Sequence, residues 1–392
     1  MIKFSVEKRA LERATALLSQ VSGLKSVGAT PSETSGLTLT ASSISLSNIN
    51  EANGVLIENI PVTIMDGQIS DHLGSTYMVN TKKLDSVVRG SGASVFFCIE
   101  ESKIVLGENK RRYELAMFST ERVEPEETKS LGYKVKIKDL VSSLGDAWCI
   151  TENAQNSAVF SSSLFSGTTV MSSDRNSILN IEHGGLFGEG LPDLMMAPDL
   201  FASCLTKVQA EEAEPGFTAD SKRFVLKFDN ITLYKTLTVE KFPKVTFQDH
   251  VSKIRQAAKS ELATTTVLKA EVNLLDLKTK LKEIHSIVEA DKYHLTYLKS
   301  GAVKISNHNI KGGAEGTATV DARLTVSPET PDGLSAIFSY RHLELISELF
   351  PAGKDQTVTL LALLDAKSRV PVIKWIAVYS EAKSYCFTPA AQ

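Results

Sequence analysis

The segment 333–392 contains one supersecondary unit that the rest of the chain repeats in looser form. A short apolar strand at 334–338 leads through Ser339, a residue type favoured at helix N-caps, into a predicted helix at 340–349. Pro351 ends this helix. Strands are then predicted at 357–364, 371–379 and around 385–389. One such unit cannot bury its apolar face alone, so several copies have to pack together.

Five earlier segments repeat this order of strand, helix and antiparallel strands. Their helices are expected at 7–22, after Asn80, after a strand at 133–137, from about Pro198, and from Leu274. The last of these has the clearest apolar stripe, formed by Leu274, Leu277, Leu281, Ile284 and Val288. The third unit should also contain strands at 157–162 and 167–171, and the fourth an acidic loop at 211–214.

Six units pair naturally into three domains of ordinary size. The charged, proline-containing segment 124–127 marks the first boundary, and Lys241-Phe242-Pro243 closes the second domain. The predicted domains are therefore 1–125, 126–250 and 251–392. Six helices on extensive antiparallel sheet predict an α+β fold. If the domains form an arc, the six helices share its concave surface.

Composition is that of a globular protein and excludes several classes. The formal net charge of −3 argues against a generally basic nucleic-acid binder, although a basic lining can be balanced by acidic residues elsewhere. The four cysteines are far apart and show no CxxC spacing, so neither a disulfide framework nor a zinc site is expected, and a reducing cytoplasm fits best. The sequence has no signal peptide and no apolar run of transmembrane length.

No catalytic or cofactor motif stands out. The chain lacks a G-x-x-x-x-G-K-[ST] sequence and a G-x-G-x-x-G sequence after a strand, and its histidines never pair at metal-ligand spacing. The glycine-rich stretch 311–316 lies between two predicted strands, which favours a hairpin turn over a phosphate loop. We therefore expect no enzyme activity, no metal and no cofactor.

Cationic residues recur on all six predicted helices. One such residue is more often a solvated side chain than a ligand site. Together they could line a surface for a phosphate backbone, since charge attraction needs no base-specific geometry. The candidate DNA-binding residues are Arg9, Arg13, Lys82, Arg89, Lys138, Lys207, Lys278, Lys282 and Arg341.

Several local sequences resemble the bacterial DNA polymerase III β subunit, the DNA sliding clamp. The opening K-F-S-V-E-K-R-A-L-E-R-A is similar to the short strand and immediate helix that begin a clamp. The segment 231–245, with its Phe-Pro pair, resembles the end of the family's second domain, and Asp291-Lys292-Tyr293 resembles the exit of a third-domain helix. The ending Tyr385-Cys386-Phe387-Thr388-Pro389 resembles the clamp C-terminus. These segments occur in the same order as in the family, and together they extend over the whole chain.

This resemblance implies a non-catalytic processivity factor. Two chains of three clamp domains would close head to tail, with helices lining the hole and antiparallel sheets outside. The homodimer would encircle double-stranded DNA and tether a DNA polymerase after a clamp loader has placed it. The resemblance also implies a partner-peptide groove between the second and third domains, surrounded by Ile178, Pro243, Phe247, Tyr293, His342, Val370, Thr388 and Pro389. Ile178 and Val370 fit ordinary core positions equally well.

The chain departs from the family at the segment that borders this groove. A Thr-Asp-Gly-His-Arg-Leu-like sequence is replaced by Ser173-Asp174-Arg175-Asn176-Ser177-Ile178, which places Arg175 on the rim. Such divergence would suit a virus-encoded clamp that serves its own polymerase. Two other classes stay open from the residues: a β-rich structural or assembly protein built of repeated modules, and a hydrolase that uses dispersed carboxylates.

Overall fold

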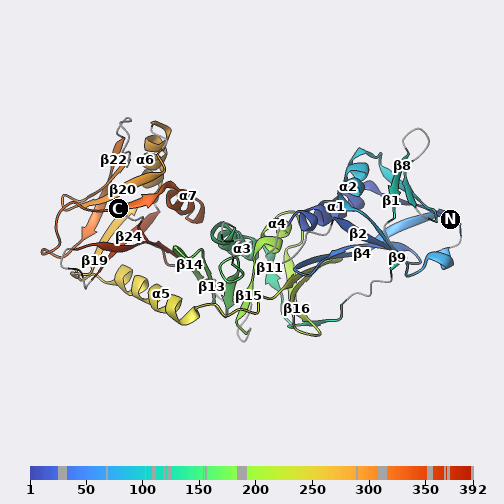
Figure 1. Ribbon diagram of the computed structural model, residues 1–392, viewed down its shortest axis with the longest axis horizontal. Coiled ribbons are helices and arrows are strands. Elements are labelled where there is room, and N and C mark those ends of the chain that lie inside the picture. The colour runs from blue at the N-terminus through green and yellow to red at the C-terminus, as the bar shows by residue number, and fades with distance from the viewer. Residues whose placement is uncertain are drawn as a thin grey trace. The chain divides into compact units, whose positions relative to one another are not determined.

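The computed structural model describes residues 1–24, 33–67, 69–101, 103–107, 112–117, 120–121, 126–152, 154, 157–182, 192–287, 290–307, 316–350, 356–365, 368 and 371–389. The chain divides into two compact units. Unit 1 holds residues 1–148, 155–158 and 186–240, and unit 2 holds residues 149–154, 159–185 and 241–392. Each unit combines helices with antiparallel sheet, so the predicted α+β class is confirmed (Figure 1).

The helices are α1 (Lys8–Gly23), α2 (Thr81–Gly90), α3 (Ile137–Thr151), α4 (Asp199–Leu205), α5 (Lys244–Lys259), α6 (Leu274–Ile287) and α7 (Tyr340–Leu349), with a short helix η1 (Ile69–His72). Unit 1 contains strands β1 (Ile2–Glu7), β2 (Thr34–Leu39), β3 (Ser43–Ile49), β4 (Asn53–Asp66), β5 (Thr76–Asn80), β6 (Ser94–Ile99), β7 (Lys103–Leu106), β8 (Tyr113–Ala116), β9 (Thr120–Glu121), β10 (Thr128–Ser130), β11 (Val135–Lys136), β15 (Leu194–Met196), β16 (Glu212–Thr218), β17 (Arg223–Phe228) and β18 (Ile231–Thr236). Unit 2 contains β12 (Ser163–Ser166), β13 (Thr169–Ser173), β14 (Ser177–Glu182), β19 (Val267–Asn273), β20 (Lys292–Leu298), β21 (Ala302–Asn307), β22 (Thr317–Thr325), β23 (Leu334–Ser339), β24 (Thr357–Leu364), β25 (Ile373–Tyr379) and β26 (Lys383–Phe387).

The main sheet of unit 1 runs in the order β10-β16-β17-β18-β4-β1-β6-β7-β8. Strand β4 belongs to the predicted first domain and β18 to the predicted second. They pair antiparallel from Asn53 opposite Lys235 to Ile57 opposite Ile231, so one continuous sheet crosses the predicted boundary. We call this the β4–β18 junction.

A buried ion pair lies at the β4–β18 junction. Lys235 Nζ donates to Asp199 Oδ1 at 2.5 Å and to Asn53 Oδ1 at 2.6 Å. All three residues are at most 2% exposed. A buried charge is tolerated only when it is paired and hydrogen-bonded, so these contacts hold β18, the start of α4 and the start of β4 together.

Unit 2 contains a second strand pair across a predicted boundary. Its strands run in the order β12-β13-β14-β26-β25-β24-β19-β22-β21-β20-β23. Strand β14 of the predicted second domain pairs antiparallel with β26 of the third, from Ser177 opposite Phe387 to Ile181 opposite Lys383. We call this the β14–β26 junction. It is the counterpart of the β4–β18 junction, because each joins the last strand of one domain to the strand that closes the first half of the domain before it.

Helices cover both faces of the β14–β26 junction (Figure 1). Cys386 and Ile178 share a cluster with Val251 and Ile254 of α5. Phe387, one residue further along β26, stacks instead on His342 of α7. Successive residues of a strand point to opposite faces, so α5 lies on one face of this sheet and α7 on the other.

Most predicted elements are confirmed, including the helix at 340–349, which matches α7. Three local expectations are wrong. Residues 158–161 form turns, and the strand begins only at Ser163. The expected acidic loop at 211–214 is the start of β16, where the sheet accommodates Glu212 as an exposed residue. Helix α5 was not expected, and the predicted boundary at residue 250 lies inside it.

Candidate nucleic-acid interface and partner surface

Helices α1 and α2 of unit 1 pack against each other and share polar contacts. Lys8 Nζ, at the start of α1, donates to the backbone oxygens of Arg89 and Ser91 at 2.9 and 3.0 Å. These carbonyls belong to the end of α2, where a cation is favourable because the terminal carbonyls lack helical partners. Thr15 Oγ1 donates to the buried Asp85 Oδ1 at 2.8 Å. The contacts fix the two cation-bearing helices side by side.

Six of the nine predicted DNA-binding residues lie in unit 1, and all are exposed. Arg89 pairs with Asp85 at 2.9 Å, and Arg13 Nη2 donates to Gln209 Oε1 at 2.8 Å. The side chains of the other four have no ion pair or hydrogen bond within the described part of the chain. They are Arg9, Lys82, Lys138 and Lys207. Their charges are therefore available to an anionic ligand.

The three predicted cations of unit 2 differ from one another. Lys278 Nζ donates to the backbone oxygens of Ser347 and Phe350 at 2.7 and 2.5 Å, so it caps the end of α7 as Lys8 caps α2. Burial, and then the neighbouring charge of Lys282, lower the pKa of Lys278. Arg341 binds Glu152 and the backbone oxygen of Cys149. Only Lys282 is exposed and unpaired over the described residues.

The predicted groove residues lie on two different faces of the unit 2 sheet. Ile178 is 3% exposed and packs in the α5 cluster together with the half-buried Phe247. Tyr293 and His342 lie on the opposite face, in the aromatic side chains next to α6 and α7. A sheet separates the two pairs, so the structure does not bring all predicted residues together.

His342 and Tyr293 belong to a continuous set of stacked rings. His342 stacks on Phe387 with ring centroids 4.2 Å apart, and its Nδ1 lies 2.7 Å from the Tyr385 hydroxyl. Burial lowers the pKa of His342 to about 4, so the ring is neutral near pH 7. On α6, His285 stacks on Tyr340 at 3.5 Å and contacts the Tyr293 hydroxyl at 2.8 Å. These rings join α6 and α7 to the sheet and form core.

The remaining predicted groove residues surround the end of β26. The Thr388 backbone N–H donates to the Asn176 oxygen at 2.9 Å, and Pro389 is half-buried. Arg175 is exposed, has a φ of 83°, and holds its guanidinium 5.3 Å from the centre of the Phe160 ring. Pro243 is the N-cap residue of α5. Val370 lies outside the described residues.

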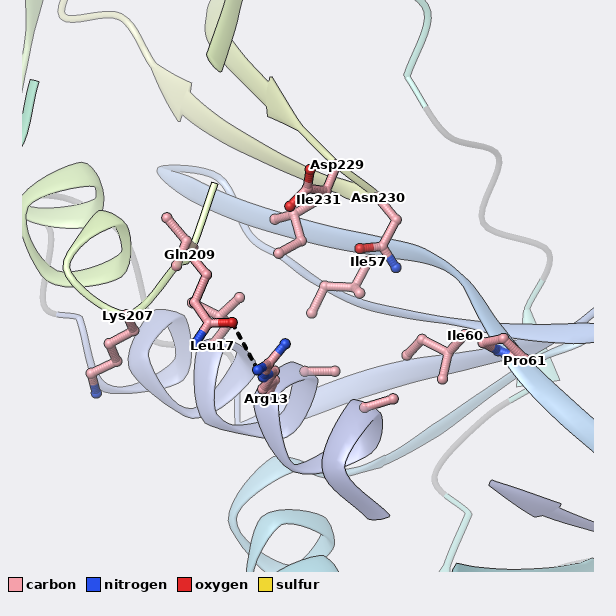
Figure 2. A pocket seen from close by; sticks show the side chains of 13 residues that line it. Arg13, Leu17, Ile57, Ile60, Pro61, Lys207, Gln209, Asp229, Asn230 and Ile231 are labelled. Atoms are coloured by element: carbon pink, nitrogen blue, oxygen red, sulfur yellow. Dashed lines mark hydrogen bonds between the residues drawn. The ribbon is translucent and has the colours of Figure 1, made fainter. Parts of the chain in front are cut away.

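Unit 1 contains a pocket of about 240 Å³ that sequence reasoning missed (Figure 2). Its walls come from α1, β4, the segment after α4 and the turn between β17 and β18, which are far apart in sequence. The Arg13–Gln209 hydrogen bond joins two of its lining side chains, one from α1 and one from the segment after α4 (Figure 2). The lining residues are Ala10, Arg13, Ala14, Leu17, Ile57, Ile60, Pro61, Lys207, Val208, Gln209, Asp229, Asn230 and Ile231.

The described residues contain no group of three or more His, Cys, Asp or Glu side chains that could hold a metal ion. Within the same part of the chain, no helix is long and apolar enough to cross a membrane.

Comparison with solved structures finds the same fold along the whole chain. A DNA polymerase III β subunit from Thermotoga maritima matches with a TM-score of 0.74 at 10% sequence identity, covering 100% of both chains. DNA polymerase sliding clamps from Bacillus subtilis and Caulobacter crescentus match with TM-scores of 0.75 at 9% and 12% identity, and cover 99% and 100% of those chains. Scans against protein-family models and against curated proteins find no match.

These likenesses confirm, at the level of the fold, the resemblance predicted from the sequence. The chain has the DNA clamp fold. Its residues have diverged widely, so what it binds has to be argued from its own side chains.

Proposed function

We propose that the chain is a DNA sliding clamp, a ring-shaped processivity factor that encircles duplex DNA and tethers a replicative DNA polymerase. The observation that carries this proposal is the match over the full length to solved bacterial β subunits and sliding clamps. A clamp needs no chemistry of its own. It turns repeated bimolecular rebinding of the polymerase into local rebinding at high effective concentration.

The ring would consist of two chains, each with three domains at 1–125, 126–250 and 251–392. Both junctions within the chain pair the last strand of one domain with the strand that closes the first half of the domain before it. By analogy, β22, which closes the first half of the third domain, should pair with β8 of the first domain in a second chain, because β8 is the last strand of that domain longer than two residues. Head-to-tail contacts of this kind close a ring when the rotation between copies allows it.

Both strands offer a free edge among the described residues. β8 pairs only with β7, and residues 317–321 of β22 pair only with β21. The Ala322 N–H donates to the Gly301 oxygen, and the Asn307 N–H donates to the Gly316 oxygen. These two bonds determine which residues of β22 direct their N–H groups toward β21, namely every second one. The N–H of Thr319 therefore points away from β21, toward the open edge. At the start of β8, Tyr113 is 44% exposed, as expected for a surface that a second chain covers.

DNA contact would come from the five exposed cations whose side chains have no partner among the described residues. Arg9, Lys82, Lys138, Lys207 and Lys282 lie on or just after five different helices. Attraction to phosphates is non-directional and sequence-independent, so a ring lined in this way holds DNA without being fixed in place. Polymerase and clamp loader are the proposed protein partners.

A topological assay tests the proposal. The protein is incubated at length with nicked circular plasmid, so that spontaneous opening of junctions allows rings to load, and the plasmid is isolated at high salt. We expect protein to stay on the circle and to leave once a restriction enzyme linearises it. Equal retention on circular and linear DNA would contradict encirclement.

Charge reversal tests the helix surface separately. The triple variant Arg9→Glu, Lys82→Glu, Lys282→Glu should load at least tenfold less, because three phosphate contacts per chain become repulsive. The matched control Lys134→Glu, Lys222→Glu, Lys253→Glu changes exposed lysines outside the candidate set and should load normally. Equal loss in both variants would show that total charge matters, and not these helices.

A further inference from the structure

The pocket of unit 1 has walls that other contacts hold in place (Figure 2). The turn between β17 and β18 is fixed on β4 by two hydrogen bonds. The Glu58 N–H donates to the Asn230 oxygen at 2.9 Å, and Asn230 Nδ2 donates to the Glu58 oxygen at 2.5 Å. On the opposite wall, the Thr15–Asp85 hydrogen bond holds α1 against α2. The pocket is therefore a preformed cavity, as small-molecule sites usually are.

A β-bulge in β4 directs two isoleucines into this pocket. In a regular strand, residues three apart point to opposite faces. The pairing of β4 with β3 shifts by one residue between Ile57 and Ile60, and Asn59 has a φ of 54°. The extra residue of the bulge brings Ile57 and Ile60 to the same pocket. Both side chains are at most 3% exposed, so they form an apolar floor.

Helix α1 leaves space in front of this floor. Ala10 and Ala14 lie one turn apart on the helix face that lines the pocket, and Leu17 follows at the next position on that face. An alanine side chain ends at its methyl group, so the helix does not fill the space before β4. The cavity of about 240 Å³ is therefore lined along its length by apolar groups from helix and strand.

The polar end of the pocket is built around Arg13. Its Nη2 donates to Gln209 Oε1 at 2.8 Å, which orients the guanidinium, and its other N–H groups donate to no residue among those described. Figure 2 shows Arg13 and Gln209 at one end of the pocket and Ile60 at the other. An oriented guanidinium with free donors matches the geometry of a carboxylate. The pocket therefore combines an apolar floor with one cation at its end.

The other ionisable residues of the lining limit the charge of a ligand. Lys207 extends away from Arg13 in Figure 2, so it adds positive charge near the pocket without sharing the same contact. Asp229, on the turn between β17 and β18, contributes a negative charge that would repel a second anionic group. This distribution favours a ligand with a single negative charge.

We propose that the pocket binds a small organic monoanion with a compact apolar body, such as an aryl carboxylate. The apolar body lies between the two alanines of α1 and the two isoleucines of β4, and the carboxylate pairs with Arg13. Helix α1 and β4 belong to the predicted first domain, and the segment with Gln209 and Asp229 to the second. A ligand held by both stabilises unit 1, because it binds the folded chain and not the unfolded one.

The first test compares 2-naphthoate with its uncharged counterpart 2-naphthamide by equilibrium dialysis against the full chain. We expect one site that binds 2-naphthoate at least tenfold more tightly than 2-naphthamide, because only the anion pairs with Arg13. Arg13→Gln should remove this preference. Arg9→Gln removes the neighbouring exposed cation of α1, which does not line the pocket, and should keep it.

Three outcomes of the dialysis would overturn the proposal. They are no saturable binding of 2-naphthoate, a preference that Arg13→Gln leaves intact, and an equal loss of preference in Arg9→Gln. The last would show that the total charge of α1 attracts the anion, and not the oriented guanidinium.

The second test fills the cavity and does not depend on the Arg13 variant. Ala10→Phe places a ring in the pocket, whereas Ala16→Phe makes the same change on α1 outside the lining. The melting temperature of the unaltered chain and of Ala16→Phe should rise with the concentration of 2-naphthoate. Ala10→Phe, with an unchanged circular dichroism spectrum, should show no rise. A rise as large in Ala10→Phe as in Ala16→Phe would place the ligand elsewhere and overturn the proposal.

This inference goes beyond the proposed clamp function and does not depend on it. Neither test contains DNA or a partner protein. A chain that fails the topological assay but binds 2-naphthoate as expected would keep the anion pocket and lose the clamp assignment. The reverse pattern would keep the clamp and leave the pocket as a gap in the packing of unit 1.

Discussion

The two strand junctions of this chain share a backbone arrangement but differ in how their side chains stabilise it. At the β4–β18 junction, Lys235 lies buried between Asp199 and Asn53. At the β14–β26 junction, an apolar row is covered by α5. Backbone pairing is the same in kind at both, since each is an antiparallel ladder between strands of different predicted domains.

The comparison shows that both junctions share the antiparallel strand pairing, whereas the side chains that stabilise it differ from one junction to the other. A buried ion pair has strict geometry, and replacing either partner leaves a buried charge unpaired. An apolar cluster tolerates substitutions that keep its volume. The β4–β18 junction therefore depends on one specific set of polar partners, and the β14–β26 junction on apolar burial beneath α5.

The largest effect is expected at the ion pair. Lys235→Met leaves Asp199 buried without its partner and should lower the free energy of unfolding by about 3–5 kcal/mol. Urea titration followed by circular dichroism measures the change. Lys222→Met is the matched control, because Lys222 is exposed and its ion-pair partner Asp220 is exposed too, and no measurable change is expected there. Similar losses in both variants would remove the distinction between the junctions.

The next effect compares the sheet beneath α5 with α5 itself. Leu361→Ala truncates a fully buried residue of the sheet and should lower the free energy of unfolding by about 3 kcal/mol. Ile254→Ala in α5 should cost less, about 2 kcal/mol, because α5 buries only a narrow stripe and can shift to fill part of the space. Paired urea titrations measure both changes. An Ile254→Ala loss as large as that of Leu361→Ala would show that α5 packs as tightly as the sheet beneath it.

Acid should destabilise unit 2 through His342. The pKa of His342 is about 4 in the folded protein because of burial, and about 6.5 when unfolded. The unfolded state therefore binds more protons between these values. The neutral ring's contribution is complete above about pH 6.5 and is lost progressively down to about pH 4, by up to about 3 kcal/mol. His342→Asn should flatten this slope in unfolding experiments from pH 7 to pH 4, and an unchanged slope would assign it to other groups.

The smallest effect compares the two lysine caps. Lys8→Met and Lys278→Met each remove a cation from the carbonyls at the end of a helix, α2 and α7 respectively, and should each cost about 1 kcal/mol. Lys282→Met, one turn from Lys278 and unpaired over the described residues, should leave thermal stability unchanged. If Lys282→Met destabilises as much as Lys278→Met, the cap contacts do not account for the role of Lys278.

Local patterns predicted most of the fold because they depend on near neighbours. The apolar stripe of α6 and the residues that end α7 can be recognised from one or two helical turns of sequence. Helix α5 was missed because few of its 16 residues are apolar, so its stripe is thin. One signal was present. Phe242 and Phe247 flank the Pro243 N-cap and pack with ring centroids 5.0 Å apart, which is the hydrophobic staple of a helix start.

The site was harder to predict because it depends on which face of a strand each residue occupies. The resemblance grouped Ile178 with His342. In the structure, Ile178 packs beside Cys386 and His342 stacks on Phe387. Cys386 and Phe387 are successive residues of β26 and point to opposite faces, so Ile178 and His342 lie on opposite faces too. Similarly, Lys278 and Lys282 look alike in sequence. Only the placement of the α7 carbonyls distinguishes a structural cap from an available charge.

The native mass of the protein tests most directly whether the junction rule continues between chains. The account predicts a dimer of twice 42.6 kDa at micromolar concentration by light scattering. It also predicts that Thr319→Pro, which removes an N–H from the open edge of β22, gives a monomer of 42.6 kDa while Thr319→Ala remains a dimer. A monomer or trimer for the unaltered chain, or a dimer that Thr319→Pro leaves intact, would contradict the account.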